Sequence, residues 1–175
     1  MILVADASAL IALAACESLY LLAALFGTVR VPEAVYFEVA QADKPYSQRL
    51  QHYLQDKTLP VNMGDYVYLD AFADTGETAA MLLYKQLHAN YLLIDDKRGR
   101  RVAAINQIAT VGSLGVLLQA KRAKLVALLA PLLAQIETSP VFISPSLLTT
   151  VLELAGESPA NASQAGKTAS TTKGT

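Results

Sequence analysis

The segment YLLIDDKRGRRVA, residues 91–103, places two adjacent acids between an apolar run and a helical pattern. Its first four residues have the length and composition of a strand that is covered on both faces of a sheet. Helical patterns flank this strand over residues 75–88 and 99–107, and such alternation indicates an α/β fold with a parallel sheet. The segment therefore predicts a strand that carries Asp95 and Asp96 at its carboxyl end.

The same alternation continues on both sides of this segment. Ser8 is predicted to cap the first helix, Gly27 to end the second, and Pro32 to occupy the first position of the third. The other expected strands cover residues 2–5, 28–31, 59–61 and 110–111. The other expected helices follow Ser8 and cover 19–26, 32 onward, 45–57, 113–122, 125–136 and 145–155.

The chain is predicted to form one domain over residues 1–157, followed by a disordered polar tail over residues 158–175. Its 175 residues and 53% hydrophobic content suffice for one sizeable core. The tail consists mostly of Ser, Ala, Thr, Gly and Lys, with almost no large apolar side chain to bury. The net charge of −1 excludes a global basic field, so any contact with nucleic acid needs a local patch.

The apolar N-terminus raises the question of targeting. No Lys or Arg precedes Arg30, and Asp6 and Glu17 interrupt the apolar run, so neither a signal peptide nor a membrane span is expected. Residues 13–16, LAAC, resemble a lipoprotein cleavage box, but the basic start of a lipoprotein signal is missing. The single cysteine, Cys16, excludes an internal disulfide and fits a reducing, cytoplasmic location.

Three acids are predicted to meet at one edge of the sheet. Asp6 follows the first strand, and Asp95 and Asp96 follow the strand at 91–94. Parallel strands share their direction, so their carboxyl ends lie at the same edge, where open α/β sheets form their sites. Carboxylates crowded there repel each other unless they are protonated or bridged by a cation. Ligands that are all oxygen suit Mg²⁺ or Mn²⁺ better than zinc.

Each acid also has a simpler explanation. Glu77 lies in the first turn of a predicted helix, where a negative charge complements the helix dipole. Glu38 could be an exposed residue on an amphipathic helix. Asp6 could be an ordinary turn residue, and the pair at 95–96 could cap the next helix. The argument for a site therefore rests on the acids as a set.

The set as a whole resembles the PIN-domain superfamily of metal-dependent nucleases. The matching pieces together extend over about residues 1–157, and they are VADAS at 4–8, VPEAVYFEV at 31–39, GETAA at 76–80, LLIDDKRGRRVA at 92–103 and TVGSLGVL at 110–117. The resemblance implies an α/β protein in which a three-layer α/β/α sandwich surrounds a central parallel sheet. It also implies an acidic site that holds one or two divalent ions, Mg²⁺ or Mn²⁺.

The resemblance assigns roles to particular residues. The acids that match the family's catalytic set are Asp6, Glu38, Glu77 and Asp96. The metal ligands that it implies are Asp6, Asp96 and Glu77, with Asp95 as a neighbour that shares the role. Family members usually carry Thr or Ser two positions before the final acid, where this chain has Ile94, so which of Asp95 and Asp96 faces the metal stays open. Ser8 matches a small polar residue that supports the first acid.

Basic residues next to the acids are candidates for binding the nucleic-acid backbone. Lys97, Arg98 and Arg101 follow the acidic pair, and Lys121 belongs to a second cluster. Either cluster could contact phosphates. Alternatively, Arg98 and Arg101 could pair with the nearby acids and organise the site.

The sequence therefore predicts a hydrolase, an endoribonuclease that needs a divalent metal. Many relatives are VapC-type toxins of toxin–antitoxin pairs, so the resemblance also implies a homodimer and a small antitoxin partner. The alternative is a catalytically weak PIN-like protein that binds RNA or a partner. A different phosphoryl-transfer enzyme is disfavoured, because no Walker-type loop and no G-x-G-x-x-G after a strand occurs in the sequence.

Overall fold

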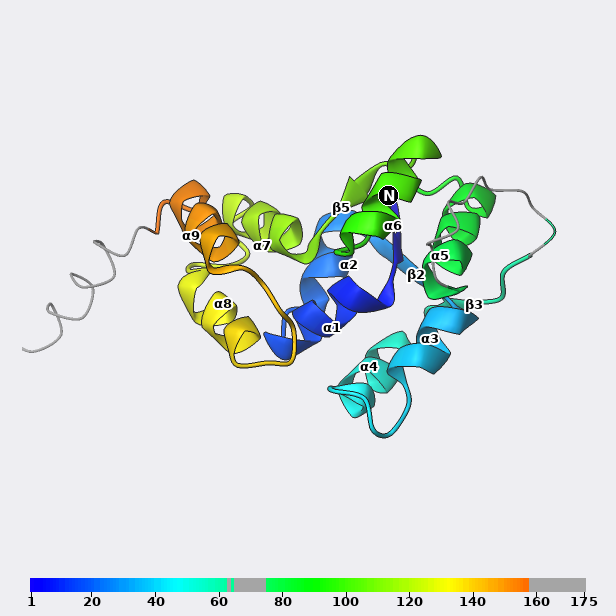
Figure 1. The fold of residues 1–175 in the computed structure, drawn as a ribbon, viewed down its shortest axis with the longest axis horizontal. Helices are drawn as coiled ribbons and strands as arrows, with labels where there is room; N and C mark the ends of the chain where they lie inside the picture. Colours follow the sequence, from blue (N-terminus) through cyan, green and yellow to red (C-terminus); the bar gives the residue numbers. More distant parts are fainter. Residues whose placement is uncertain (63, 65–74, 158–175) are drawn as a thin grey trace, which may run out of the picture.

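The computed structural model describes residues 1–62, 64 and 75–157 (Figure 1). Its elements, in chain order, are β1 (Ile2–Ala5), α1 (Ala7–Ala15), α2 (Tyr20–Phe26), β2 (Thr28–Pro32), α3 (Glu33–Val39), α4 (Ser47–Leu54), β3 (Thr58–Leu59), α5 (Thr75–Gln86), β4 (Tyr91–Leu93), α6 (Lys97–Ile105), β5 (Thr110–Val111), α7 (Ser113–Arg122), α8 (Ala130–Glu137) and α9 (Pro145–Leu154). The predicted tail over residues 158–175 lies outside the described residues.

The described strands form a five-stranded sheet in the order β3-β2-β1-β4-β5, and all neighbouring pairs are parallel. The chain adds β2 and β3 on one side of β1 and then crosses to add β4 and β5 on the other. The order therefore reverses between β1 and β4, and open α/β sheets form their ligand sites outside the carboxyl ends of the strands at such a point. The predicted parallel sheet is confirmed, and so is the predicted adjacency of the strand ends that carry Asp6 and Asp95.

Helices cover both faces of the sheet and create two apolar cores. Leu3 and Leu93 point into the larger core, which contains buried side chains of α1, α2, α3, α4, α7, α8 and α9. Val4 and Leu92, one position away on the same strands, point into a smaller core with α5 and α6. This alternation follows from the two-residue period of a strand. The fold is thus the expected three-layer α/β/α arrangement, with α7, α8 and α9 gathered at one end in Figure 1 and α3, α4 and α5 at the other.

The first helix begins earlier than the sequence analysis predicts, and Ser8 is not its cap. Asp6 is the N-cap, because its backbone is still extended and its carboxylate accepts a hydrogen bond from the Ser8 N–H at 3.3 Å. One residue, Asp6, thus separates β1 from α1. Ser8 lies in the first helical turn, and its hydroxyl donates to the Asp6 carboxylate at 2.9 Å.

Two further helix starts differ from the prediction for backbone reasons. Pro32 has an extended ψ of 154°, so it ends β2 and caps α3, and Glu33 is the first helical residue. The helix predicted over 125–136 begins only at Ala130, with Pro131 in its first turn. Proline lacks the N–H that a preceding turn would need, so it favours a helix start at this point.

No single described helix is long and apolar enough to cross a membrane. The bent pair of α1 and α2, with an angle of 115° between them, meets that criterion by length and composition alone.

Candidate functional site

Asp6 lies at the carboxyl end of β1, beside the end of β4, and this residue is only 4% exposed. Its N–H donates to the Leu93 carbonyl at 2.9 Å, which joins the end of β1 to the end of β4. The Ser8 hydroxyl donates to the Asp6 carboxylate at 2.9 Å and accepts from the Asp95 N–H at 3.3 Å. Ser8 therefore connects the first acid of the set to the backbone of the second.

The Asp95 carboxylate is held by the start of α7. One oxygen accepts from the Ser113 N–H at 2.8 Å, and the other accepts from the Ser113 hydroxyl at 2.6 Å. Gly112 makes this approach possible, because a Cβ there would lie 2.8 Å from the Asp95 oxygen. Ser113 is not among the predicted site residues, although a Gly-Ser pair at a strand–helix junction is a recognisable helix-start signal.

Asp96 makes a different set of contacts and caps α6. Its Oδ1 accepts from the N–H groups of Arg98, at 2.7 Å, and Gly99, at 2.9 Å. The side chain of Asp96 is exposed at the edge of the sheet, whereas that of Asp95 is half-buried. The two adjacent acids thus have different surroundings, a distinction that their sequence alone leaves open.

Glu77 lies in the first turn of α5 and is 6% exposed, so it is nearly as buried as Asp6. Its carboxyl group packs against Gly99 in α6, where a Cβ would lie 2.6 Å from Glu77 Oε1 and 2.4 Å from Ile94 Cδ1. The missing side chain at Gly99 therefore brings Glu77 to the same helical turn that Asp96 caps. Gly99 is a second residue that the sequence analysis did not connect with the acids.

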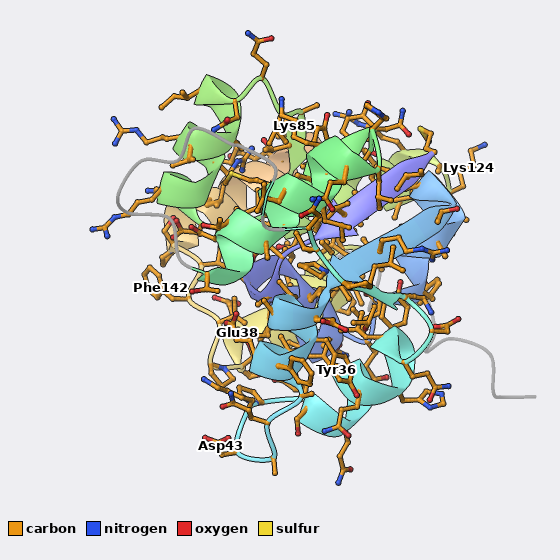
Figure 2. The ribbon with its side chains drawn as sticks, turned by 90° about the vertical axis from the view of Figure 1, so that its right-hand side faces the viewer. Tyr36, Glu38, Asp43, Lys85, Lys124 and Phe142 are labelled. Atoms are coloured by element: carbon orange, nitrogen blue, oxygen red, sulfur yellow. The ribbon has the colours of Figure 1, made fainter. Side chains whose placement is uncertain are left out.

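Glu38 lies on α3, where it is half-buried. It lines an open pocket of about 470 Å³ between α3 and the first turn of α5, which carries Glu77. Figure 2 shows Glu38 on the face where α3 and α5 lie side by side. The four acids of the predicted catalytic set therefore come from four parts of the chain: Asp6 from the end of β1, Asp96 from the end of β4, Glu77 from α5 and Glu38 from α3.

The donors are all carboxylate oxygens, which fits a hard cation such as Mg²⁺ or Mn²⁺. Their convergence is incomplete, because over residues 1–62, 64 and 75–157 no three His, Cys, Asp or Glu side chains form a group that could hold a metal ion. The chemistry of the set thus fits a divalent ion, although no three of the described acids are close enough together to form such a group.

The two predicted basic clusters have different surroundings. Lys97, Arg98 and Arg101 lie on α6 directly after Asp96, and all three are exposed. Lys121, at the far end of α7, forms an ion pair with Glu157 and donates to the Ala127 carbonyl at 3.1 Å. The α6 cluster therefore adjoins the acids, while Lys121 has a structural partner, and its predicted contact with RNA stays a prediction.

The sheet is open and parallel, and carboxylates lie where its strand order reverses. The protein is therefore an α/β protein with acids at the carboxyl edge of its sheet. A family model described as the PIN domain matches residues 2–157, and the chain belongs to this family. PIN domains are generally nucleases that use divalent metals. The resemblance found in the sequence is thereby confirmed at the level of the superfamily. No match was found among the curated proteins or among the solved structures.

Proposed function

We propose that this PIN domain is an endoribonuclease that hydrolyses RNA phosphodiester bonds with the help of Mg²⁺ or Mn²⁺. The observation that carries the proposal is the position of the acids at the carboxyl edge of β1 and β4, where the strand order reverses. Open α/β sheets bind their ligands at such a switch point. Two of the acids, Asp6 and Glu77, are also more than nine-tenths buried, which is costly for a carboxylate and common at functional sites.

In this proposal Asp6, Glu77 and Asp96 hold the ion, and Glu38 contributes directly or through water. When bound, the ion would supply a water molecule that is activated for attack on the phosphodiester. The cluster of Lys97, Arg98 and Arg101 beside Asp96 would contact the RNA phosphates and orient the strand.

Asp95 has a different role in the proposal, because both of its oxygens accept hydrogen bonds from Ser113. It would act as a positioning residue that fixes the end of β4 and, through its N–H and Ser8, the Asp6 carboxylate. Outer partners of this kind orient the ligands of a metal and tune their affinity.

The test is cleavage of a mixed RNA pool by the full chain with increasing Mn²⁺ or Mg²⁺, compared with the substitutions Asp6→Asn, Asp95→Asn and Asp96→Asn. Asp43→Asn is the matched control, since Asp43 is an exposed acid in the α3–α4 loop (Figure 2). We expect Asp6→Asn and Asp96→Asn to lose cleavage and Asp43→Asn to retain it. Asp95→Asn should lose about 10- to 100-fold, as an outer-shell change does.

Circular dichroism of each variant separates loss of activity from loss of fold. Metal-independent cleavage, or equal cleavage by wild type and Asp6→Asn, would contradict the proposed site. An inactive wild type would instead favour the second candidate function, a protein that binds RNA or a partner without cutting. The observation that favours this second candidate is that no three described acids form a metal-holding group.

A toxin role, a small antitoxin partner and a homodimer are finer parts of the proposal and rest on the sequence resemblance alone. Expression of the wild type and of Asp6→Asn in a bacterial host would test the toxin role. Growth arrest by the wild type only, relieved by a small protein encoded beside it, is the expected result. Equal growth with both proteins would favour a housekeeping nuclease.

A further inference from the structure

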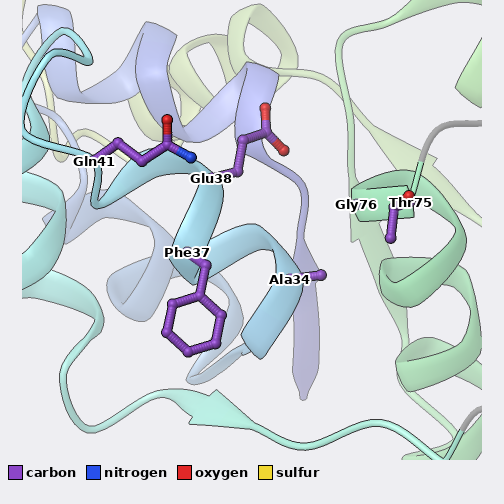
Figure 3. A pocket seen from close by; sticks show the side chains of 6 residues that line it. All are labelled: Ala34, Phe37, Glu38, Gln41, Thr75 and Gly76. Atoms are coloured by element: carbon purple, nitrogen blue, oxygen red, sulfur yellow. The ribbon is translucent and has the colours of Figure 1, made fainter.

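The open pocket beside Glu38 has no role in the proposed reaction. Its volume of about 470 Å³ lies within the range of roughly 300–1,000 Å³ that is usual for small-ligand sites. The described residues that line it are Ala34, Phe37, Glu38, Gln41, Thr75 and Gly76. In Figure 3 the short side chain of Ala34 points toward Gly76 and Thr75 across the pocket. Two of the lining residues, Ala34 and Gly76, have little or no side chain and so leave space there.

Phe37 is an unusual residue to find at the mouth of this pocket. Its ring is 64% exposed, although a phenyl ring normally contributes to stability by being buried. The ring packs edge-on against Tyr36, with centroids 5.8 Å apart and an interplanar angle of 70°. Tyr36 is itself packed against the larger core, so the exposed Phe37 ring contacts a residue that the core holds in place.

The polar side chains that line the pocket suggest what it can hold. Glu38 forms one side, and its carboxylate oxygens can accept hydrogen bonds. The side-chain amide of Gln41, which points to the same side as Glu38 in Figure 3, can both donate and accept hydrogen bonds. A flat, uncharged group with donors and acceptors on its edge fits this combination of an exposed ring, an amide and a carboxylate.

We propose that this pocket holds one unpaired nucleobase of the RNA strand, stacked on Phe37 with its polar edge toward Gln41. The inference rests on the proposed function, because it adds a base-binding subsite beside the same acidic site. Stacking on aromatic rings is the common way in which proteins hold unpaired bases, and it tolerates different sequences. A base held beside Glu38 and Gly76 would place the strand next to Glu77.

The test measures binding without cleavage, by fluorescence anisotropy of labelled RNA hexamers with the full chain in EDTA. One series of hexamers lacks a single base at each position in turn and keeps the sugar–phosphate backbone. With wild type, we expect removal of one particular base to weaken binding roughly tenfold, within the range for loss of a base–aromatic stack. The intact hexamer should bind Phe37→Ala roughly tenfold more weakly than it binds wild type. The hexamer that lacks the critical base should bind Phe37→Ala no more weakly than the intact hexamer does.

Two further variants and one control make the result specific. Phe37→Tyr keeps the ring and should bind as wild type does, whereas Ala34→Leu fills the pocket and should behave like Phe37→Ala. Tyr20→Ala removes a comparably exposed ring, 57% exposed on α2, that does not line the pocket, and it should change nothing. Double-stranded RNA of the same sequence should bind equally to wild type and Phe37→Ala, because its bases are paired.

The outcomes separate this inference from the proposed nuclease activity. Binding that is equal for wild type and Phe37→Ala, or no binding of single-stranded RNA at all, would overturn the nucleobase pocket. Metal-dependent cleavage together with that result would leave the nuclease proposal intact. Base-dependent binding by a wild type that never cleaves would support the pocket and overturn the nuclease.

Discussion

Two glycines at the edge of the sheet decide where its acids can lie. Gly112 allows Asp95 to reach the start of α7, and Gly99 allows Glu77 to pack against the start of α6. Neither glycine has a positive φ, so the requirement is one of space and not of backbone conformation. At this scale, the site depends as much on missing side chains as on the carboxylates themselves.

Gly99→Ala should lower the free energy of unfolding by about 1–3 kcal/mol, the usual cost of overpacking. The added Cβ would lie 2.4 Å from Ile94 Cδ1 and 2.6 Å from Glu77 Oε1, so both side chains must move. Gly115→Ala is the matched control, because that Cβ would lie 3.3 Å from Val111 Cγ2. There the gain in helix propensity, about 1 kcal/mol, offsets the tight contact. Urea denaturation measures both, and equal stability of the two variants would contradict the packing argument.

Helix α8 begins at a cap supplied from outside its own sequence neighbourhood. The Glu157 carboxylate accepts from the N–H groups of Leu129, at 2.7 Å, and Ala130, at 2.8 Å, and it pairs with Lys121. Its side chain is only 9% exposed. Burial raises the pKa of this carboxyl, but the hydrogen bonds from Lys121, Leu129 and Ala130 outweigh it and hold the pKa below its usual value. Glu157, which lies shortly after α9, thus links this segment to α7 and α8.

Glu157→Gln should lower the free energy of unfolding at pH 7 by about 1–2 kcal/mol, since an amide replaces a charged acceptor. A depressed pKa in the folded state adds stability that is fully present above the unfolded pKa, near 4.3, and is lost as pH falls through the folded pKa. The difference between wild type and variant should therefore shrink below about pH 4.3. Urea denaturation at pH 7, 5 and 3.5 tests this. Glu137→Gln, an exposed acid on α8, is the control. A stability difference between wild type and Glu157→Gln that is independent of pH would contradict the role of the Glu157 charge.

The two cores on either face of the sheet belong to one folding unit, because β1 and β4 contribute side chains to both. Leu3 and Leu93 serve the larger core, while Val4 and Leu92 serve the smaller one. Loosening either core therefore disturbs the strands that carry the acids. The whole molecule, and not a local motif, holds these strand ends in place.

Leu10→Ala in the larger core and Met81→Ala in the smaller core should each cost about 2–5 kcal/mol. Both side chains are fully buried, whereas Leu125, the control for a Leu→Ala change, is 44% exposed and should cost within about 0.5 kcal/mol. Unfolding followed by circular dichroism and by tyrosine fluorescence should give one coincident transition for each variant. An early, partial transition confined to Met81→Ala would show that α5 and α6 unfold separately.

Most elements could be predicted because their signals are local. Apolar runs of four residues predicted β1 and β4, and the helical pattern after Gly112 predicted α7 with the observed bounds. The helix predicted over 125–136 is present as α8, but it begins five residues later than predicted, because Pro131 favours a helix start at this point. Ser8 was predicted as a cap, but the strand ends so close to the helix that Asp6 takes that position.

The sequence by itself determined that acids follow the first and fourth strands, since a strand's apolar run and the polar residue that ends it are adjacent in the chain. Parallel pairing then follows from the alternation of strands and helices. Only the tertiary structure decided which way each acid turns. Asp95 is bound by Ser8 and Ser113, which are 87 and 18 residues away. Contacts over such separations depend on how the helices pack on the sheet, and no local pattern encodes that packing.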